Sequence, residues 1–78
     1  MQSKKLLVEL GLFSLNSEST LEKRISELNM RQLDRLKLMF GRLDMKKSIF
    51  SEKTRIGIRN NEFSAYAEAV RMLNNLFG

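Results

Sequence analysis

The feature that most constrains the fold is a change of phase in the apolar pattern at Asn29. Before this residue, Leu21, Ile25 and Leu28 recur at spacings of four and three residues, which places them on one face of a helix. Continuing the same face would bury Arg35. The apolar set that follows lies on a different face and consists of Leu33, Leu36, Phe40 and Leu43. The pattern therefore predicts two successive helices rather than one long helix.

Both helices carry an N-terminal signature. Residues 19–22 read Ser-Thr-Leu-Glu and residues 29–32 read Asn-Met-Arg-Gln. In such a capping box, the first side chain accepts a hydrogen bond from the fourth residue's amide, and the fourth side chain reaches back. We therefore expect one helix over residues 19–28 and the next over residues 30–46. Gly41 lies inside the second helix, where it costs about 1 kcal/mol relative to Ala and permits close approach of a neighbouring helix.

The flanking segments differ in how clearly they can be interpreted. Residues 3–10 are predicted to form a short helix ending at Gly11, which suits the left-handed conformation that often follows a helix. Residues 53–59 alternate with a period of two, which fits a short strand, and a basic loop fits equally well. The last predicted helix covers residues 61–77, with apolar positions spaced three, four, three and four. These seam residues are Phe63, Tyr66, Val70, Leu73 and Phe77.

The length of the chain limits what its core can stabilise. With 78 residues it forms a single domain, residues 1–78, and a chain of this size buries only about 60% of its unfolded surface. It has no Cys, so a disulfide cannot supplement the core. We therefore predict an all-α fold, a small bundle of about four helices that is completed by homodimerisation through the seam.

The charge is concentrated in the central helices. The net charge is +5, and residues 19–47 hold eight Lys or Arg against four Asp or Glu. Four cations of the 30–46 helix lie within about 60° of one another, beside its apolar face. Cations arranged in this way can neutralise phosphates, so the first hypothesis is a small non-enzymatic regulatory protein that binds nucleic acid and controls transcription. The predicted contacts are Arg31, Arg35, Arg42, Lys46, Lys47, Lys53, Arg55 and Arg59.

A second hypothesis rests on apolar residues outside the core face. Leu38, Met39 and Met45 make the 30–46 helix apolar on more than one side. That surplus fits a protein–protein adaptor or inhibitor that docks on a larger partner through a helix face. An ordinary solvated helix face also explains the basic stripe, and the sequence leaves the target and its identity open.

The sequence contains no pattern typical of catalysis. It has no His and no Cys, and its four glycines are scattered rather than grouped into a phosphate-binding loop. Its carboxylates mostly neighbour Lys or Arg, which indicates ion pairing. We therefore expect no enzymatic activity, no catalytic residue, no metal site and no cofactor. No apolar run approaches the roughly 18 residues that span a bilayer, so we expect no membrane partner and a cytoplasmic location.

Overall fold

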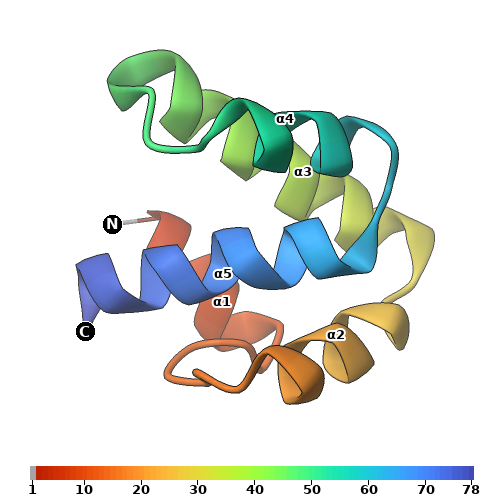
Figure 1. The fold of residues 1–78 in the computed structure, drawn as a ribbon. Coiled ribbons are helices and arrows are strands. Elements are labelled where there is room, and N and C mark those ends of the chain that lie inside the picture. The colour runs from red at the N-terminus through yellow and green to blue at the C-terminus, as the bar shows by residue number, and fades with distance from the viewer. Residues whose placement is uncertain (1) are drawn as a thin grey trace.

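The computed structural model describes residues 2–78, and this part of the chain folds into five helices without a strand (Figure 1). The helices are α1 (Gln2–Glu9), α2 (Glu18–Ser26), α3 (Met30–Lys47), α4 (Glu52–Arg59) and α5 (Phe63–Phe77). The all-α prediction is confirmed. The number of helices was underestimated, because residues 52–59 form a helix of their own.

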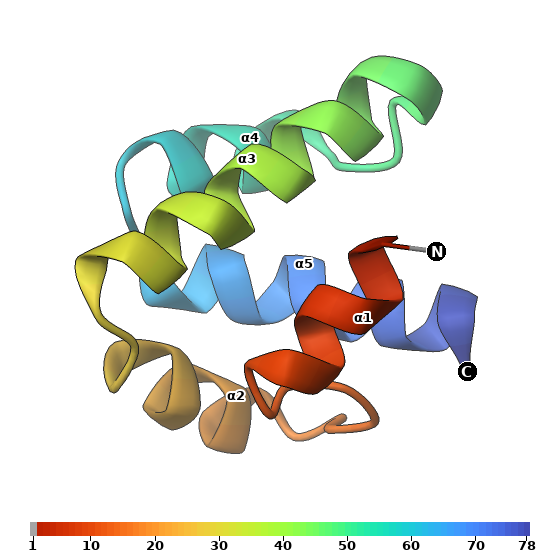
Figure 2. The same cartoon turned by 180° about the vertical axis from the view of Figure 1, so that it is seen from behind.

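Helix α5 is the centre of the arrangement. It crosses the middle of the molecule, with α2 on one side and the pair α3 and α4 on the other (Figure 1). Seen from behind, α1 runs across α5 (Figure 2). The closest helix packing is that of α5 against α2 and α4. The last helix of the described chain therefore joins segments from both of its halves.

The predicted break at Asn29 is confirmed. The Asn29 side chain accepts a hydrogen bond from the Gln32 amide at 2.9 Å, and the Gln32 side chain accepts one from the Asn29 amide at 3.0 Å. The predicted start of the preceding helix was two residues late. Ser17, not Ser19, is the N-cap of α2, and its hydroxyl accepts from the Thr20 amide at 3.4 Å.

Residues 52–59 form neither the strand nor the loop that the alternating pattern suggested. Ser51 caps α4 by accepting a hydrogen bond from the Thr54 amide at 3.2 Å. The buried positions of this helix are Thr54, Gly57 and Ile58, which follow helical spacing, while Ile56 remains exposed. Two turns of helix are short enough for a period of two and a helical period to fit the same residues, and packing on α5 selects the helix.

The seam of the last helix is used within the chain. Tyr66, Val70 and Leu73 are at most 1% exposed, because other segments of the same chain cover them. These three residues are therefore closed to a second copy in this fold, which corrects their assignment to a dimer interface. Phe63, with 38% exposure, and the half-buried Phe77 remain accessible, so homodimerisation through these two stays a prediction.

The junction of α3, α4 and α5 is tightly packed. The Phe40 ring meets Phe50 and Tyr66 edge to face, with ring centroids 5.7 and 5.8 Å apart. Gly57 allows α4 to approach α5, since a Cβ atom at this position would lie 2.4 Å from the Cβ of Ala65. No residue larger than glycine fits there without a shift of one helix.

The N-terminal segment is tied to the end of the chain. Helix α1 ends one residue before the predicted position, and Gly11 has a φ of +73°, which confirms the predicted left-handed residue after the helix. The buried Asn74 amide of α5 donates hydrogen bonds to the carbonyls of Leu12 and Leu15 at 3.0 and 2.8 Å. These bonds fix the loop between α1 and α2 against α5.

Candidate binding groove beside the basic helix

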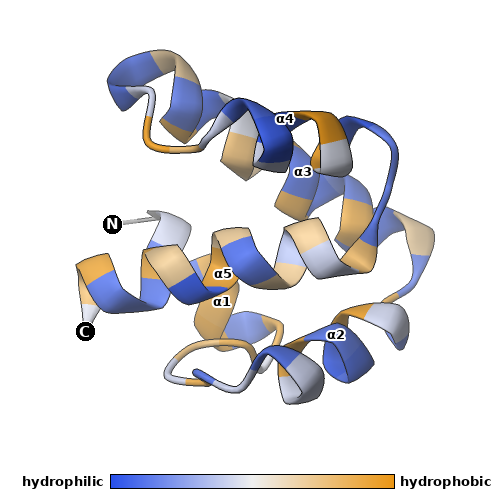
Figure 3. Cartoon of the chain, in the orientation of Figure 1, coloured by the Kyte–Doolittle hydropathy of each residue, from blue (hydrophilic) through white to orange (hydrophobic). Residues whose placement is uncertain are grey.

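A groove of about 1020 Å³ lies between α1, the C-terminal half of α3 and the C-terminal end of α5. Its floor is mostly apolar and is lined by Leu6, Leu38, Met39, Leu43, Ile49, Leu73, Leu76 and Phe77. Leu38 and Leu76 are 62% and 63% exposed. Figure 3 shows the hydrophobic residues at the C-terminal end of α5, where this helix borders the groove. Leu38 and Leu76 therefore give the groove exposed apolar area.

Positive charge surrounds the apolar floor. The cations that line the groove are Lys5, Arg35, Arg42, Lys46 and Lys47. Glu9 is the single carboxylate among the lining residues. Because Lys5 comes from α1 and the other four cations from α3, the charge lies on both walls. An occupant would therefore meet an apolar surface between two basic edges.

Glu9 and Arg35 form an ion pair between the two walls. The Arg35 Nη1 atom lies 2.6 Å from the Glu9 Oε2 atom, and each side chain is about half exposed. Within the part of the chain that the structure describes, Arg42, Lys46 and Lys47 form no ion pair. The positive potential of the groove therefore comes mainly from cations that the fold leaves uncompensated.

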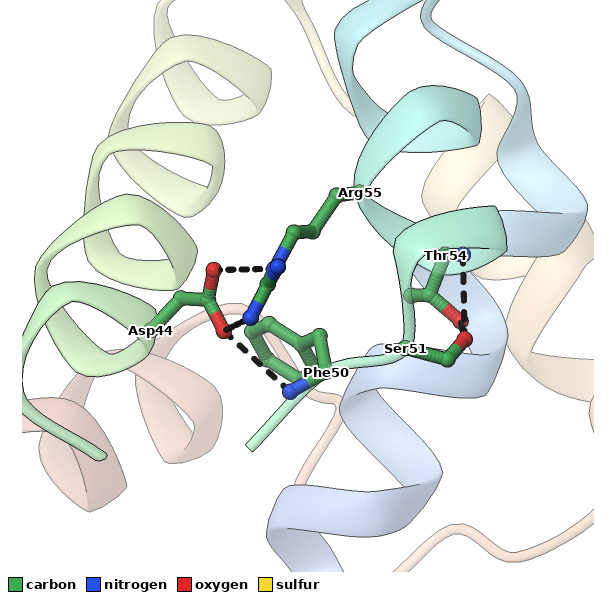
Figure 4. Close-up of polar contacts among 5 residues, drawn as sticks. All are labelled: Asp44, Phe50, Ser51, Thr54 and Arg55. Carbon is green, nitrogen blue, oxygen red and sulfur yellow. Dashed lines mark hydrogen bonds and ion pairs between the residues drawn. The ribbon is translucent and has the colours of Figure 1, made fainter. Parts of the chain in front are cut away.

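The opposite flank of α3 is closed by α4. The Arg55 Nε atom lies 2.6 Å from Asp44 Oδ2, and Arg55 Nη2 donates to Asp44 Oδ1 at 3.3 Å (Figure 4). The Phe50 amide donates to the same Oδ1 atom at 3.2 Å. Arg55 thus links α4 to the end of α3, and its predicted nucleic-acid contact stays a prediction.

These contacts determine the acidity of Asp44. Partial burial acts to raise the pKa of this carboxyl, but the hydrogen bonds from Arg55 and Phe50 and the charge of Arg55 outweigh it. The pKa of Asp44 therefore lies below its ordinary value of 3.8.

The phenol of Tyr66 is shifted in the opposite direction. Burial, together with the charge of Asp34, raises the pKa of this phenol, which donates a hydrogen bond to Asn61 at 3.0 Å.

The structure places only some of the predicted nucleic-acid contacts in the groove. Arg35, Arg42, Lys46 and Lys47 line the groove, as stated above. Arg31 is exposed near the start of α3 and is not among the lining residues. Lys53 and Arg59 are exposed on α4, which does not contribute to the groove. With Arg55, which also lies in α4, the eight predicted cations therefore comprise four in the groove, three in α4, and Arg31.

Sequence reasoning missed the contributions of α1 and α5 to the groove. Lys5 and Leu6 come from one end of the chain, and Leu76 comes from the other. The available signal was the apolar surplus on α3, since Leu38 and Met39 both line the floor. A second hollow, of about 550 Å³, lies along α2 and its C-cap residue, from Ser19 to Glu27. Because a single helix and its cap line it, it has no opposing wall to hold an occupant.

Among residues 2–78, no group of three or more His, Cys, Asp or Glu is placed to hold a metal ion. None of the five helices described is both long and apolar enough to span a bilayer. Comparisons with models of protein families, with curated proteins and with solved structures found no match to this chain.

Proposed function

We propose that the chain is a non-catalytic adaptor or inhibitor that docks a segment of a larger partner protein in the groove between α1, α3 and α5. The observation that supports this proposal is the combination of an apolar floor with cations on both walls. Apolar area supplies most of the affinity in a protein interface, and surrounding charge selects the partner and speeds association.

Nucleic-acid binding remains a second candidate function because of the net charge of +5 and the exposed cations on α3 and α4. Two features make it the weaker candidate. The charged phosphates of a nucleic acid do not pack against the apolar side chains of the floor. The aromatic rings of Phe40, Phe50 and Tyr66 are buried, so these three rings cannot stack on bases. This function would rely mainly on the exposed cations, with affinity that falls steeply as salt rises.

Two matched double variants distinguish the two functions. Arg42→Glu with Lys46→Glu changes the groove, and Lys53→Glu with Arg59→Glu changes the exposed surface of α4. Each substitution changes the charge by two, so both variants lower the net charge from +5 to +1. All four side chains are exposed, and each variant replaces one cation in the last turn of a helix, Lys46 or Arg59, so we expect similar losses in the free energy of unfolding, of about 1 kcal/mol.

The experiment is affinity purification with wild-type chain and both variants as baits, with and without nuclease. We expect one stoichiometric protein that is retained by wild type and by the α4 variant, is lost from the groove variant, and is insensitive to nuclease. Loss from both variants together with nuclease sensitivity would instead favour nucleic acid. Retention by all three baits would exclude the groove as the docking site.

A further inference from the structure

We propose that the occupant of the groove is an acidic amphipathic helix, and that one of its carboxylates displaces Glu9 from Arg35. This inference rests on the proposed function. It specifies the chemistry of the partner segment, and it identifies Glu9 as the residue that limits the affinity of the groove for that segment. Three observations support it. The groove offers few hydrogen-bond partners for a peptide backbone, it is positively charged, and an exposed ion pair lies between its walls.

The backbone chemistry favours a helical occupant. An extended peptide needs partners for its N–H and C=O groups, and the apolar side chains of the floor cannot supply them. The described chain also contains no strand whose edge an extended peptide could extend. A helix forms its own backbone hydrogen bonds and presents an apolar stripe at intervals of three and four residues. It can therefore cover Leu38 and Leu76 without leaving backbone N–H and C=O groups unpaired.

The charge favours acidic residues on both sides of that stripe. Lys5 stands on the α1 wall, and Arg42 and Lys46 stand on the α3 wall. A helix lying along the floor would bring its flanking residues toward both walls at once. Glutamates there would meet these cations, whereas lysines would be repelled.

The Glu9–Arg35 pair already forms the kind of contact that the partner would make. Its atoms are 2.6 Å apart, yet both side chains are 49% exposed, and such exposed pairs contribute little to stability. A carboxylate from the partner can therefore replace Glu9 at low cost, with Arg35 exchanging one acid for another. Glu9 thus acts as an internal competitor that lowers affinity for acidic segments.

The test uses three designed peptides of 20 residues as probes. They share one leucine stripe with helical spacing and differ only in the residues flanking the stripe, which are all Glu, all Gln or all Lys. Binding is measured by fluorescence anisotropy for wild type, Glu9→Gln, Arg35→Gln and the Glu9→Gln, Arg35→Gln double variant. Circular dichroism confirms that each variant is folded.

We expect the Glu peptide to bind wild type more tightly than the Gln peptide does, and the Lys peptide not to bind. Glu9→Gln should tighten the Glu peptide by about fivefold, the equivalent of one exposed ion pair. The same substitution should have a smaller effect when Arg35 is already Gln, because only the repulsion between Glu9 and the peptide's glutamates is then removed. Methyl resonances of Leu38 and Leu76 should shift on binding, whereas those of Ile56 on α4 should not.

Several outcomes would overturn the inference. Equal binding of the Glu and Lys peptides would remove the charge argument, and unchanged affinity in Glu9→Gln would remove the competition. Tighter binding of a 20-base-pair duplex or of phosphatidylserine vesicles would point to a different macromolecule. If these tests fail while the bait experiment still yields a partner that depends on the groove, the proposed function stands and only this inference is lost.

Discussion

On the flank of α3 that faces α4, charged and apolar side chains are paired within the fold, whereas on the flank that faces α1 they remain open. Arg55 is held by Asp44, and Phe40 is enclosed by Phe50 and Tyr66. Across the helix, the cations of the groove surround apolar residues of which Leu38 and Leu76 are more than half exposed. Residues of the same types therefore stabilise the fold on one flank and remain available for binding on the other.

The difference shows that a count of cations does not locate a binding surface. Arg55 and Arg42 are both arginines in the basic part of the sequence, but only Arg42 is left without a carboxylate partner in the described chain. The useful criterion is whether the fold already compensates the charge. Four substitutions test this contrast between the flanks.

The largest effect is expected for Phe40→Ala on the closed flank. Removing the ring leaves a cavity among Phe50 and Tyr66, and substitutions of this kind cost about 3–5 kcal/mol. Urea unfolding followed by circular dichroism measures the loss. Leu38→Ala on the open flank is the control and should change the free energy of unfolding by less than about 0.5 kcal/mol. Equal losses would mean that the groove is closed in solution.

Gly57→Ala should cost about 1–3 kcal/mol, because its new Cβ would overlap the Cβ of Ala65 and push α4 away from α5. Thermal unfolding measures the effect. Adding Ala65→Gly removes the second methyl group, so the double variant should lose less stability than the sum of the losses of the two single variants. A double variant whose loss equals that sum would show that the contact between the helices is looser than described.

Asp44→Asn should cost about 1 kcal/mol near neutral pH, because it keeps an acceptor for the Phe50 amide but loses the charge that pairs with Arg55. Because folding lowers the pKa of Asp44, its contribution is complete well above 3.8, the ordinary value, and is lost as the pH falls through the lower pKa of the folded state. The difference between wild type and variant should therefore shrink in acid. Urea titrations at pH 7, 4 and 2.5 measure it, and a gap that widens in acid would refute the assigned pairing.

The smallest effect is expected for Gly41→Ala, which should stabilise the chain by about 0.5–1 kcal/mol. Gly41 lies inside α3, and a Cβ at this position would meet nothing within 4 Å, so only the improved helix propensity acts. The midpoint of thermal unfolding should rise. A fall that depends on protein concentration would indicate that a second copy packs closely on this part of α3.

The break between α2 and α3 could be predicted because its causes are local. The capping residues Asn29 and Gln32 bond to each other and are only three positions apart, so a short stretch of sequence includes both partners of the interaction. The start of α2 depended on a choice between Ser17 and Ser19, which are both suitable caps, and the structure uses the earlier one. Helix α4 was missed because its burial against α5, rather than its own periodicity, determines its conformation.

The groove and the role of the seam depend on contacts between distant segments. Lys5 and Leu76 lie near opposite ends of the sequence, and no periodicity within one helix predicts that they line the same hollow. The heptad spacing of Tyr66, Val70 and Leu73 correctly indicates that a partner helix covers them. It contains no information on whether that helix belongs to the same chain, and in this structure the remainder of the fold covers these three residues.

The central position of α5 has a consequence for synthesis of the protein. Because this helix follows the other four in the chain, ribosomes expose Leu7, Leu21 and Phe40 before Val70 and Leu73 have been made. During that interval the earlier helices lack the apolar surface of α5 on which they pack. We therefore expect the chain to fold on the ribosome only after the last helix is made, rather than segment by segment. Nascent chains that stall before residue 70 should therefore be protease-sensitive along their whole emerged length.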